Sequence, residues 1–306
     1  MSAVIMDGKT LGKKIQLSAA EKTAALKEKG IVPSLAVILV GNDPASLSYV
    51  VSKEKALADA GMESRDIRFS DDLTEDALLS IISDLNDNEK VHGILVQLPL
   101  PSHISEVKVV SAISPEKDVD CFHPVSVGKL ISGESGFLPC TPHGVIKLLE
   151  EYNIPISGSH VVIVGRSNIV GKPLANLLIS KKYNATVTIC HTGTYDIAYH
   201  SRQADILIAA AGMPDLIKPD MIREDAVVVD VGVNRVLDIS SKKGYSLRGD
   251  VSRDVAEKAS FVSLVPGGVG PMTIAMLLQN VLKAAEDALE RSSRNRRAEN
   301  AGLPWR

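Results

Sequence analysis

Short apolar segments alternate with longer amphipathic segments along most of this chain. The apolar segments are only a few residues long and rich in Val and Ile, and they occur at 35–40, 93–97, 161–164, 185–190, 206–210 and 227–231. Continuous apolarity, rather than strict alternation with polar residues, is typical of parallel strands whose two faces are both covered by helices. Each segment therefore predicts a buried parallel strand.

The segments between these strands have the spacing of amphipathic helices. The clearest examples are residues 9–29, 44–60, 75–86 and 142–152. Strand–helix–strand repetition with parallel strands requires crossover connections, which are almost always right-handed. The pattern predicts an α/β fold in which each domain has three layers, two of helices around one sheet.

A domain boundary is expected where prolines and a glycine interrupt the pattern, between about residues 139 and 160. A second strand–helix series then starts at 161–164 and continues to about Val265, and the one-sided apolar pattern of 272–289 predicts a last helix that returns to the first domain. We predict a first domain of residues 1–140 plus 272–290 and a second domain of 141–271. Residues 291–306 hold five arginines and are expected to form a basic, mobile tail.

Composition and charge exclude several classes of protein. The 306 residues suffice for about two domains, and 34 basic against 37 acidic residues give a net charge of −3. This charge predicts neither nucleic acid nor an anionic membrane as a partner. The apolar segments are far shorter than the ~20 residues of a membrane-spanning helix, and no signal peptide is visible at the start. Three cysteines without CxxC spacing favour the cytoplasm, and no cluster of residues has the spacing of metal ligands.

The second domain begins with a candidate nucleotide-binding turn. Its first strand leads into Gly165-Arg166-Ser167-Asn168-Ile169-Val170-Gly171, and a strand, a glycine turn and a helix N-terminus suit a pyrophosphate. The G-x-G-x-x-G pattern is not met, because Ser167 and Val170 replace the second and third glycines and Gly171 comes one position late. An ordinary turn would also explain Gly165, but its position at the start of the series favours a dinucleotide site.

The end of the next strand favours NADP over NAD. Sites for NAD usually place an acidic residue about 20 residues after the glycine turn to bind the ribose 2′-hydroxyl. Here the strand at 185–190 is followed by His191 and Thr192, and no acidic residue precedes Asp196. Arg166, Thr192 and His191 could contact a 2′-phosphate, although His191 is equally compatible with a surface loop.

Two further segments could lie against a flat ligand. Asp230-Val231-Gly232-Val233-Asn234 places a glycine after a buried strand, where backbone could approach a nicotinamide ring. The segment 266–273 places three glycines and two prolines before the last helix. So many residues with special backbone preferences are rarely needed for a plain connection between domains.

Candidate catalytic residues occur in the first domain. Asn42-Asp43-Pro44 predicts the start of a helix on which Tyr49 and Lys53, four residues apart, share one face. A lysine beside a phenol in a partly dry cleft can act as a proton donor and acceptor, although such pairs are also common on solvated helices. Gln97 ends a predicted strand, where open α/β sheets bind ligands, and the acidic residues of 115–120 could face the same cleft.

Taken together, these segments resemble the FolD-type methylenetetrahydrofolate dehydrogenase/cyclohydrolases. The resemblance covers roughly residues 1–290 and rests on five segments in the family's order and spacing: the Tyr49/Lys53 helix, 96–99, 115–120, 165–173 and 266–273. It implies a homodimeric, bifunctional enzyme of one-carbon metabolism. Such an enzyme oxidises methylenetetrahydrofolate to the methenyl form with NADP⁺ and hydrolyses this product to 10-formyltetrahydrofolate.

The resemblance also implies residue roles. Lys53 would be the general acid/base of hydrolysis, with Tyr49 stacking on or orienting the folate, Gln97 hydrogen-bonding Lys53 and tuning its protonation, and Asp120 binding the N–H donors of the pterin. The folate site would further include Val96, Leu98, Pro266, Gly267, Gly268, Val269, Gly270, Pro271 and Thr273. NADP would contact Gly165, Arg166, Ser167, Thr192 and Val233.

One residue departs from the family's pattern. The family usually has Asp-Val-Asp-Gly-Phe, whereas Cys121 follows Asp120 here. If that glycine serves a positive φ angle or a close approach to the ligand, cysteine could shift Asp120 and weaken folate binding; alternatively, the position tolerates a small side chain. Cys121 could also be an exposed thiol that is open to alkylation.

Other functions remain open at this stage. A disturbed folate site would leave a dehydrogenase without the hydrolytic activity. A dehydrogenase of a small hydroxy or amino acid would share the fold but would have no use for Tyr49, Gln97 and Asp120. A non-catalytic nucleotide-binding module would bind NADP without turnover.

Overall fold

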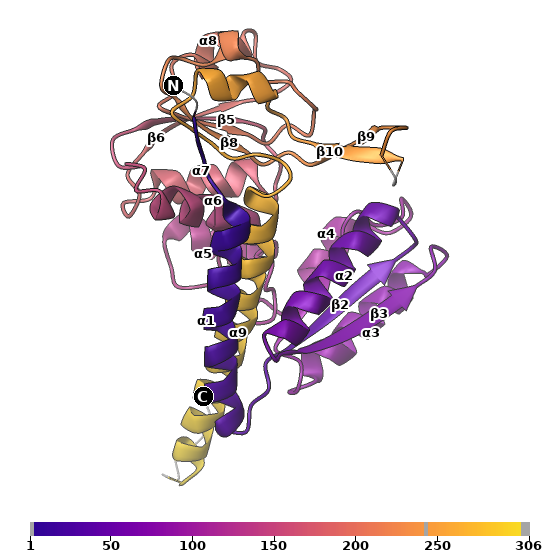
Figure 1. The fold of residues 1–306 in the computed structure, drawn as a ribbon. Helices are drawn as coiled ribbons and strands as arrows, with labels where there is room; N and C mark the ends of the chain where they lie inside the picture. Colours follow the sequence, from indigo (N-terminus) through magenta and orange to yellow (C-terminus); the bar gives the residue numbers. More distant parts are fainter. Residues whose placement is uncertain (1–2, 242–243, 301–306) are drawn as a thin grey trace. The chain divides into compact units, whose positions relative to one another are not determined.

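The computed structural model describes residues 3–241 and 244–300 and consists of two compact units (Figure 1). Unit 1 comprises Met1–Lys14 and Gly128–Met276, and unit 2 comprises Ile15–Val127 and Leu277–Arg306. Two long helices, α1 (Gly8–Glu28) and α9 (Val269–Asn300), contribute residues to both units. The N-terminal residues belong to unit 1 because strand β1 (Val4–Ile5) pairs with β11 (Phe261–Val262).

Unit 1 contains a six-stranded parallel sheet in the order β1-β11-β8-β7-β5-β6. The strands predicted at 161–164, 185–190, 206–210 and 227–231 are all present in it, within a residue or two. Its four longer strands are β5 (His160–Val164), β6 (Thr186–Cys190), β7 (Ile206–Ala209) and β8 (Val227–Asp230).

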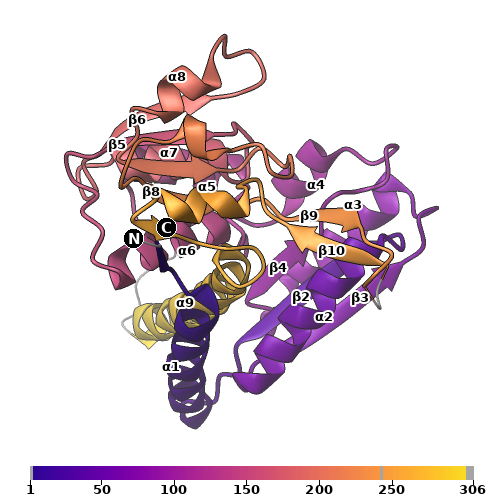
Figure 2. The same cartoon turned by 45° about the horizontal axis from the view of Figure 1, so that its top comes forward.

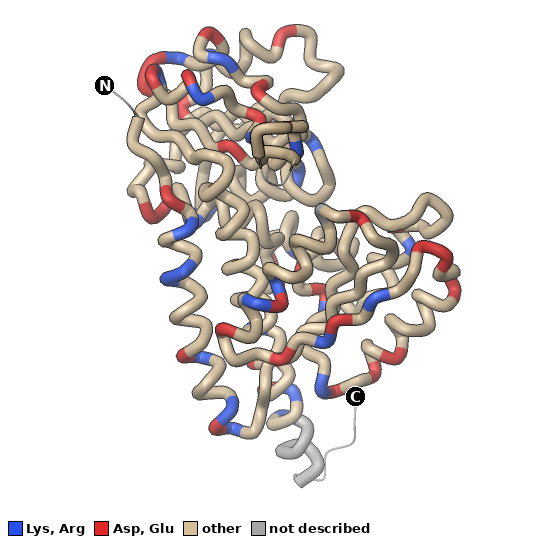
Figure 3. Tube along the Cα trace, turned by 45° about the vertical axis from the view of Figure 1, so that its right-hand side comes forward, with Lys and Arg blue, Asp and Glu red and all other residues tan. Residues whose placement is uncertain are grey.

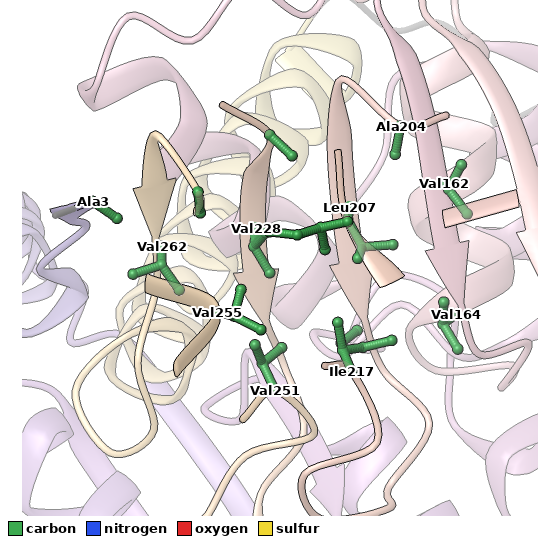
Figure 4. Packing of buried hydrophobic residues seen from close by; sticks show 14 of the residues in the cluster. Ala3, Val162, Val164, Ala204, Leu207, Ile217, Val228, Val251, Val255 and Val262 are labelled. Carbon is green, nitrogen blue, oxygen red and sulfur yellow. The ribbon is translucent and has the colours of Figure 1, made fainter. Parts of the chain in front are cut away.

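Helices cover both faces of this sheet. On one face, Val162, Leu207 and Val228 pack in a cluster (Figure 4) with side chains of α8 (Ile197–Ser201), η1 (Pro219–Met221) and η2 (Arg253–Glu257). Successive strand residues point to opposite faces, so Val161 and Ile163 lie on the other face. That face is covered by α6 (Cys140–Glu151) and α7 (Gly171–Ile179), with α5 (Pro124–Ser132) beside them, as Figure 1 shows. The three predicted layers are confirmed.

A small antiparallel hairpin completes unit 1. It consists of β9 (Asn234–Leu237) and β10 (Tyr245–Arg248) and is seen most clearly in Figure 2. Among the residues that the structure describes, these two strands form a separate two-stranded sheet.

Unit 2 contains a three-stranded parallel sheet in the order β3-β2-β4. Its strands are β2 (Ser34–Val40), β3 (Glu63–Phe69) and β4 (Gly93–Val96). Every residue of the central strand β2 is buried, as expected of its continuous apolar sequence. Side chains of α3 (Glu75–Asp87) and α4 (Glu106–Ala112) pack on one face, and α2 (Pro44–Asp59) covers β2 and β3.

The predicted return of the last helix is confirmed. In unit 1 its first turns contact α1 and α6: a Cβ atom on Gly144 would lie 2.9 Å from Met272 Cβ, and one on Gly12 would lie 3.1 Å from the Pro271 oxygen. In unit 2, Asn280 Nδ2 donates a hydrogen bond to the oxygen of Val119 (2.7 Å). Residues 291–300 continue α9, and the rest of the predicted tail lies outside the described residues, so its mobility stays a prediction.

The distribution of charged residues and the hydropathy of the helices bear on what the sequence predicts. Basic and acidic residues are both distributed over each unit (Figure 3). Among the residues that the structure describes, no helix is both long and apolar enough to cross a membrane.

Candidate active site and cofactor site

Helix α2 presents the predicted catalytic residues of unit 2. Asp43 caps the helix by accepting a hydrogen bond from Ser46 N (2.7 Å), and proline at the first helical position needs no hydrogen-bond partner for its nitrogen. This start fixes the helical register, so Tyr49 and Lys53 lie one turn apart on the same face.

The Lys53 side chain is buried and held by Gln97. Only 7% of Lys53 is exposed, and its Nζ donates a hydrogen bond to Gln97 Oε1 (3.0 Å). Gln97 follows β4 directly, and its own Nε2 donates to the oxygen of Leu98 (2.8 Å). The amide nitrogen is thereby turned toward the backbone, and the amide oxygen is left to accept from Lys53.

Tyr49 is more accessible than Lys53. About a third of the residue is exposed (36%), while burial of the rest raises the pKa of its phenol above the usual value. The phenol therefore keeps its proton near neutral pH and can donate a hydrogen bond or offer its ring face to a planar ligand.

Asp120 lies in a tightly held turn beside the end of β4. The backbone of Asp118 forms a parallel bridge with Ile94 of β4. The chain turns directly after this bridge, because Cys121 N donates to the Asp118 oxygen (3.0 Å), and Asp120 lies within that turn. The Asp118 carboxylate accepts hydrogen bonds from the nitrogens of Phe122 (3.1 Å) and His123 (2.9 Å), and this fixes the turn on both sides of residue 120. The predicted folate residues Val96, Gln97, Leu98 and Asp120 thus occupy one region of unit 2.

The position that departs from the family's pattern has the backbone conformation that glycine favours. Cys121 has a φ angle of 62°, which costs a residue other than glycine about 1–2 kcal/mol. Its side chain is nonetheless buried, with 1% exposed, and burial together with Asp118 and Asp120 raises the pKa of the thiol to about 12. The interpretation of Cys121 as an exposed, alkylation-sensitive thiol is therefore wrong. The small side chain fits the site at the cost of backbone strain.

In unit 1, two glycines are required at the nucleotide-binding turn. Gly165 has a φ angle of 137°, and a Cβ atom on it would overlap the oxygen of Ala210. A Cβ on Gly171 would in turn overlap the oxygen of Gly165. The late glycine is therefore explained, because the turn needs its second small residue where it folds back on Gly165. At the intermediate position, Ser167 Oγ accepts a hydrogen bond from Val170 N (3.1 Å) at the start of α7.

The end of β6 lies beside this turn. Gly165 N donates to the oxygen of Cys190 (2.8 Å), which joins the two segments. Arg166 and Thr192 are exposed, and the His191 ring accepts a hydrogen bond from Gly193 N (3.0 Å). Asp196, the first acidic residue after the strand, caps α8 by accepting from Tyr199 N (2.8 Å). A cation, a hydroxyl group and backbone donors without a free acidic group fit a ribose 2′-phosphate.

The remaining predicted residues also lie in unit 1. Val233 is 41% exposed and follows β8 by three residues. The segment 266–273 is anchored by hydrogen bonds from Lys9 N to the Gly267 oxygen (3.0 Å) and between the hydroxyls of Thr141 and Thr273 (2.9 Å).

Helix α9 begins at Val269, so the predicted start at Met272 is wrong by three residues. Pro271 is accommodated because the first helical turn does not need its N–H. The structure brings Lys53 and Gln97 together in unit 2, whereas Pro266–Thr273 belongs to unit 1.

No metal centre emerges from the described part of the chain. Within it, no group of three or more His, Cys, Asp or Glu side chains is arranged to hold a metal ion.

Comparison with known proteins gives concordant results. Residues 6–120 match the catalytic-domain model of tetrahydrofolate dehydrogenase/cyclohydrolase, and residues 139–289 match the NAD(P)-binding-domain model of the same family. The bifunctional protein FolD of Bacillus subtilis is 52% identical over 290 residues, which is 94% of this chain and 100% of that protein.

Solved structures with the same fold are also similar in sequence. The FolD dehydrogenase/cyclohydrolase of Campylobacter jejuni is 48% identical with a TM-score of 0.89, covering 94% of this chain and 99% of that one. The Trypanosoma brucei FolD, whose structure contains NADP and an inhibitor, is 41% identical with a TM-score of 0.91 over the same shares of the two chains.

Proposed function

The chain belongs to the tetrahydrofolate dehydrogenase/cyclohydrolase family, and on that basis we propose how its own residues carry out the two reactions. The protein is a bifunctional enzyme of one-carbon metabolism that oxidises methylenetetrahydrofolate with NADP⁺ and hydrolyses the methenyl product to 10-formyltetrahydrofolate. The assignment of residues rests chiefly on one observation: the buried Lys53 Nζ lies 3.0 Å from Gln97 Oε1 at the carboxyl end of β4.

The dehydrogenase step requires mainly positioning. NADP⁺ accepts the hydride that leaves the bridging methylene group. Gly165 and Gly171 let the turn that binds the pyrophosphate pack closely against Ala210 and fold back on itself, and Ser167 lies at the α7 N-terminus. Arg166 and Thr192 bind the 2′-phosphate, and Val233 contacts the cofactor. No group of the chain has to exchange a proton in this step, because the two flanking nitrogens already activate the methylene carbon.

The cyclohydrolase step requires a proton carrier, which is Lys53. Water oxygen bonds to the methenyl carbon and gives a proton to Lys53 Nζ. The bond between that carbon and N5 then breaks, and the hydroxyl oxygen loses its proton to solvent as it becomes the formyl C=O. N5 takes up the proton that Lys53 received, and the formyl group stays on N10. One proton is released overall, because the methenyl substrate carries a positive charge. Gln97 keeps Nζ in place during both transfers.

The other predicted residues bind the folate. Tyr49 stacks on or hydrogen-bonds the substrate with a phenol that keeps its proton. Asp120 accepts hydrogen bonds from the pterin N–H groups, and the adjacent Asp118 holds the turn that presents it. In unit 2 we assign Val96 and Leu98 to the lining of the folate site. The other residues that the resemblance predicts for folate all belong to unit 1: Pro266, Gly267, Gly268, Val269, Gly270, Pro271 and Thr273.

We further propose a homodimer that works in the cytoplasm. Strand β3 is an edge of the three-stranded sheet, so one side of its backbone is open to pairing with a second copy. The three cysteines are buried, and in the described part of the chain none forms a disulfide, which fits a reducing compartment. Sedimentation analysis at micromolar concentration tests the dimer, and a monomer there would refute it.

A progress curve tests the function and the choice of cofactor. Methylenetetrahydrofolate is mixed with enzyme and either NADP⁺ or NAD⁺, and absorbance follows methenyl formation and decay. We expect NADP⁺-dependent formation followed by decay faster than the spontaneous rate. Formation without accelerated decay would leave only a dehydrogenase, and no formation with either cofactor would refute the function.

A further inference from the structure

Two buried aspartates in unit 1 have no role in the scheme above. Asp230 is the last residue of β8, and Asp250 follows β10 by two residues; their exposed fractions are 2% and 0%. A buried carboxylate is unfavourable unless hydrogen bonds compensate for its lost hydration. In both residues these bonds come mostly from backbone N–H groups.

Asp250 joins two segments of the unit. One carboxylate oxygen accepts hydrogen bonds from Ala211 N (2.6 Å) and Gly212 N (2.8 Å), just after β7. The other accepts from Asn234 Nδ2 (2.9 Å), at the start of β9. Because bonds to an ionised acceptor are stronger than those between neutral groups, this carboxylate fixes both segments.

Asp230 holds Asp250 in place. Its Oδ1 accepts hydrogen bonds from Asp250 N (2.9 Å) and Gly232 N (3.2 Å), and its Oδ2 accepts from Val251 N (3.1 Å). Burial and the charge of Asp250 raise the pKa of Asp230 to about 7, although the backbone donors oppose the rise. Asp230 thus fixes both the turn that leads to Val233 and the backbone of its partner aspartate.

Two glycines make room for these carboxylates. A Cβ atom on Gly232 would overlap the carboxylate of Asp250, and one on Gly249 would overlap that of Asp230. The sequence suggested that Gly232 lets backbone approach a nicotinamide ring. In the structure the space of its missing side chain is filled by Asp250, and the approach to a nicotinamide ring stays a prediction.

The segments held by the two aspartates border the candidate cofactor site. The turn after β7 begins at Ala210, whose oxygen fills the space beside Gly165 and whose nitrogen donates to the Val164 oxygen (2.8 Å). The turn after β8 carries Val233. Both follow the carboxyl ends of parallel strands, where open α/β sheets bind their ligands.

We propose that Asp250, fixed by Asp230, is a positioning residue for NADP. It holds the turns after β7 and β8 in the conformation that the cofactor requires, and it does not touch the folate chemistry. The proposal rests on the proposed function for the identity of the ligand. Under this proposal, a change at Asp250 should weaken NADP⁺ binding without changing the hydrolysis that Lys53 carries out.

The test is the affinity of full-length Asp250→Asn for NADP⁺, measured by calorimetry without folate. The new amide group cannot accept hydrogen bonds on its nitrogen, so either the Ala211–Gly212 pair or Asn234 loses its acceptor. We expect the dissociation constant to rise about tenfold or more. Hydrolysis of preformed methenyltetrahydrofolate, which uses Lys53, should stay within about twofold of wild type.

A second variant displaces Asp250 without changing charge. Gly232→Ala places a Cβ in the volume of the Asp250 carboxylate, whereas Gly128→Ala, where no atom lies within 4 Å, is the matched control. We expect Gly232→Ala to weaken NADP⁺ binding to a similar extent and Gly128→Ala to bind as wild type does. If Asp250→Asn fails to fold, Gly232→Ala gives the same readout.

The outcomes separate this proposal from the proposed function. An unchanged NADP⁺ affinity in Asp250→Asn would overturn the positioning role, as would an equal loss of NADP⁺ binding and hydrolysis. A wild-type protein that binds NADP⁺ without oxidising methylenetetrahydrofolate would refute the function. In that case the ratio of the NADP⁺ dissociation constants of Asp250→Asn and the wild-type protein would still decide whether Asp250 positions the cofactor site.

Discussion

In unit 2 the reactive group is a side chain, because Lys53 extends from α2 and is held by the amide of Gln97. In unit 1 the candidate cofactor site is built from backbone. Glycines let the turn at 165–171 pack against Ala210, and the buried carboxylate of Asp250 holds the neighbouring turn after β7. A side chain can be replaced without moving the backbone, whereas a turn cannot gain a methyl group without moving its neighbours. The two sites should therefore respond differently to substitution. Replacing the Lys53 side chain should abolish proton transfer without changing the fold, whereas adding a side chain at the glycines should distort the backbone that binds the cofactor.

Lys53→Met is expected to have the largest effect on catalysis. It keeps an unbranched apolar side chain of nearly the same length but removes the proton carrier, so methenyl hydrolysis should fall by about 10²–10⁴-fold. Steady-state hydrolysis of preformed methenyltetrahydrofolate measures this. Lys55→Met on the same helix is the control and should stay near wild type, because this exposed lysine forms a surface ion pair with Asp59 (3.2 Å).

Gly165→Ala tests whether the cofactor site of unit 1 depends on close backbone packing. The added Cβ meets the Ala210 oxygen, so we expect a loss of about 3 kcal/mol in unfolding free energy and a loss of NADP⁺ binding. Gly158→Ala is the matched control, since its φ angle is also positive (80°) but no atom lies within 4 Å. Denaturant unfolding should show about 1 kcal/mol for that variant. Equal losses in the two variants would mean that backbone strain, not close contact, explains Gly165.

Arg166→Ala should change the choice of cofactor more than the rate. Removing the exposed guanidinium should weaken NADP⁺ binding about tenfold and leave NAD⁺ binding nearly unchanged, because only NADP⁺ carries the 2′-phosphate. Titration calorimetry with both dinucleotides measures the difference. Arg202→Ala, which removes an exposed arginine bonded to the Asp220 oxygen, should change neither affinity.

Cys121→Gly is expected to have the smallest effect. Glycine relieves the strain of the 62° φ angle, but it also removes a buried side chain and makes the unfolded chain more flexible. These contributions oppose one another, so unfolding free energy should change by less than about 1 kcal/mol. Both activities should stay within about twofold; a large gain in hydrolysis would show instead that the cysteine impairs the folate site.

Buried strands were the most predictable part of the fold. Strand β2 is apolar at almost every position because helices cover both of its faces, and sequence alone locates it. Strand β3, with the sequence ESRDIRF, was not predicted, because it lies at the sheet edge and all of its positions are exposed or half-buried. The polar hairpin of β9 and β10 and the two-residue strands β1 and β11 likewise have no apolar segment to indicate them.

The candidate sites were predictable only in part. The helical period places Tyr49 and Lys53 together, but the contact of Lys53 with Gln97 depends on the non-local strand order β3-β2-β4 and came from the family resemblance. The late Gly171 was visible in the sequence, while its cause, the approach to Gly165, required the folded turn. Asp250 had no local signal, because its partners come from segments 16 to 39 residues away.

The most direct test of this account is a single progress curve of Lys53→Met with methylenetetrahydrofolate and NADP⁺. If hydride transfer depends on the cofactor site of unit 1 and hydrolysis on Lys53, methenyltetrahydrofolate should form and then accumulate, decaying only at the spontaneous rate. Decay at the wild-type rate, or loss of hydride transfer together with hydrolysis in a folded protein that still binds NADP⁺, would contradict the separation of the two activities.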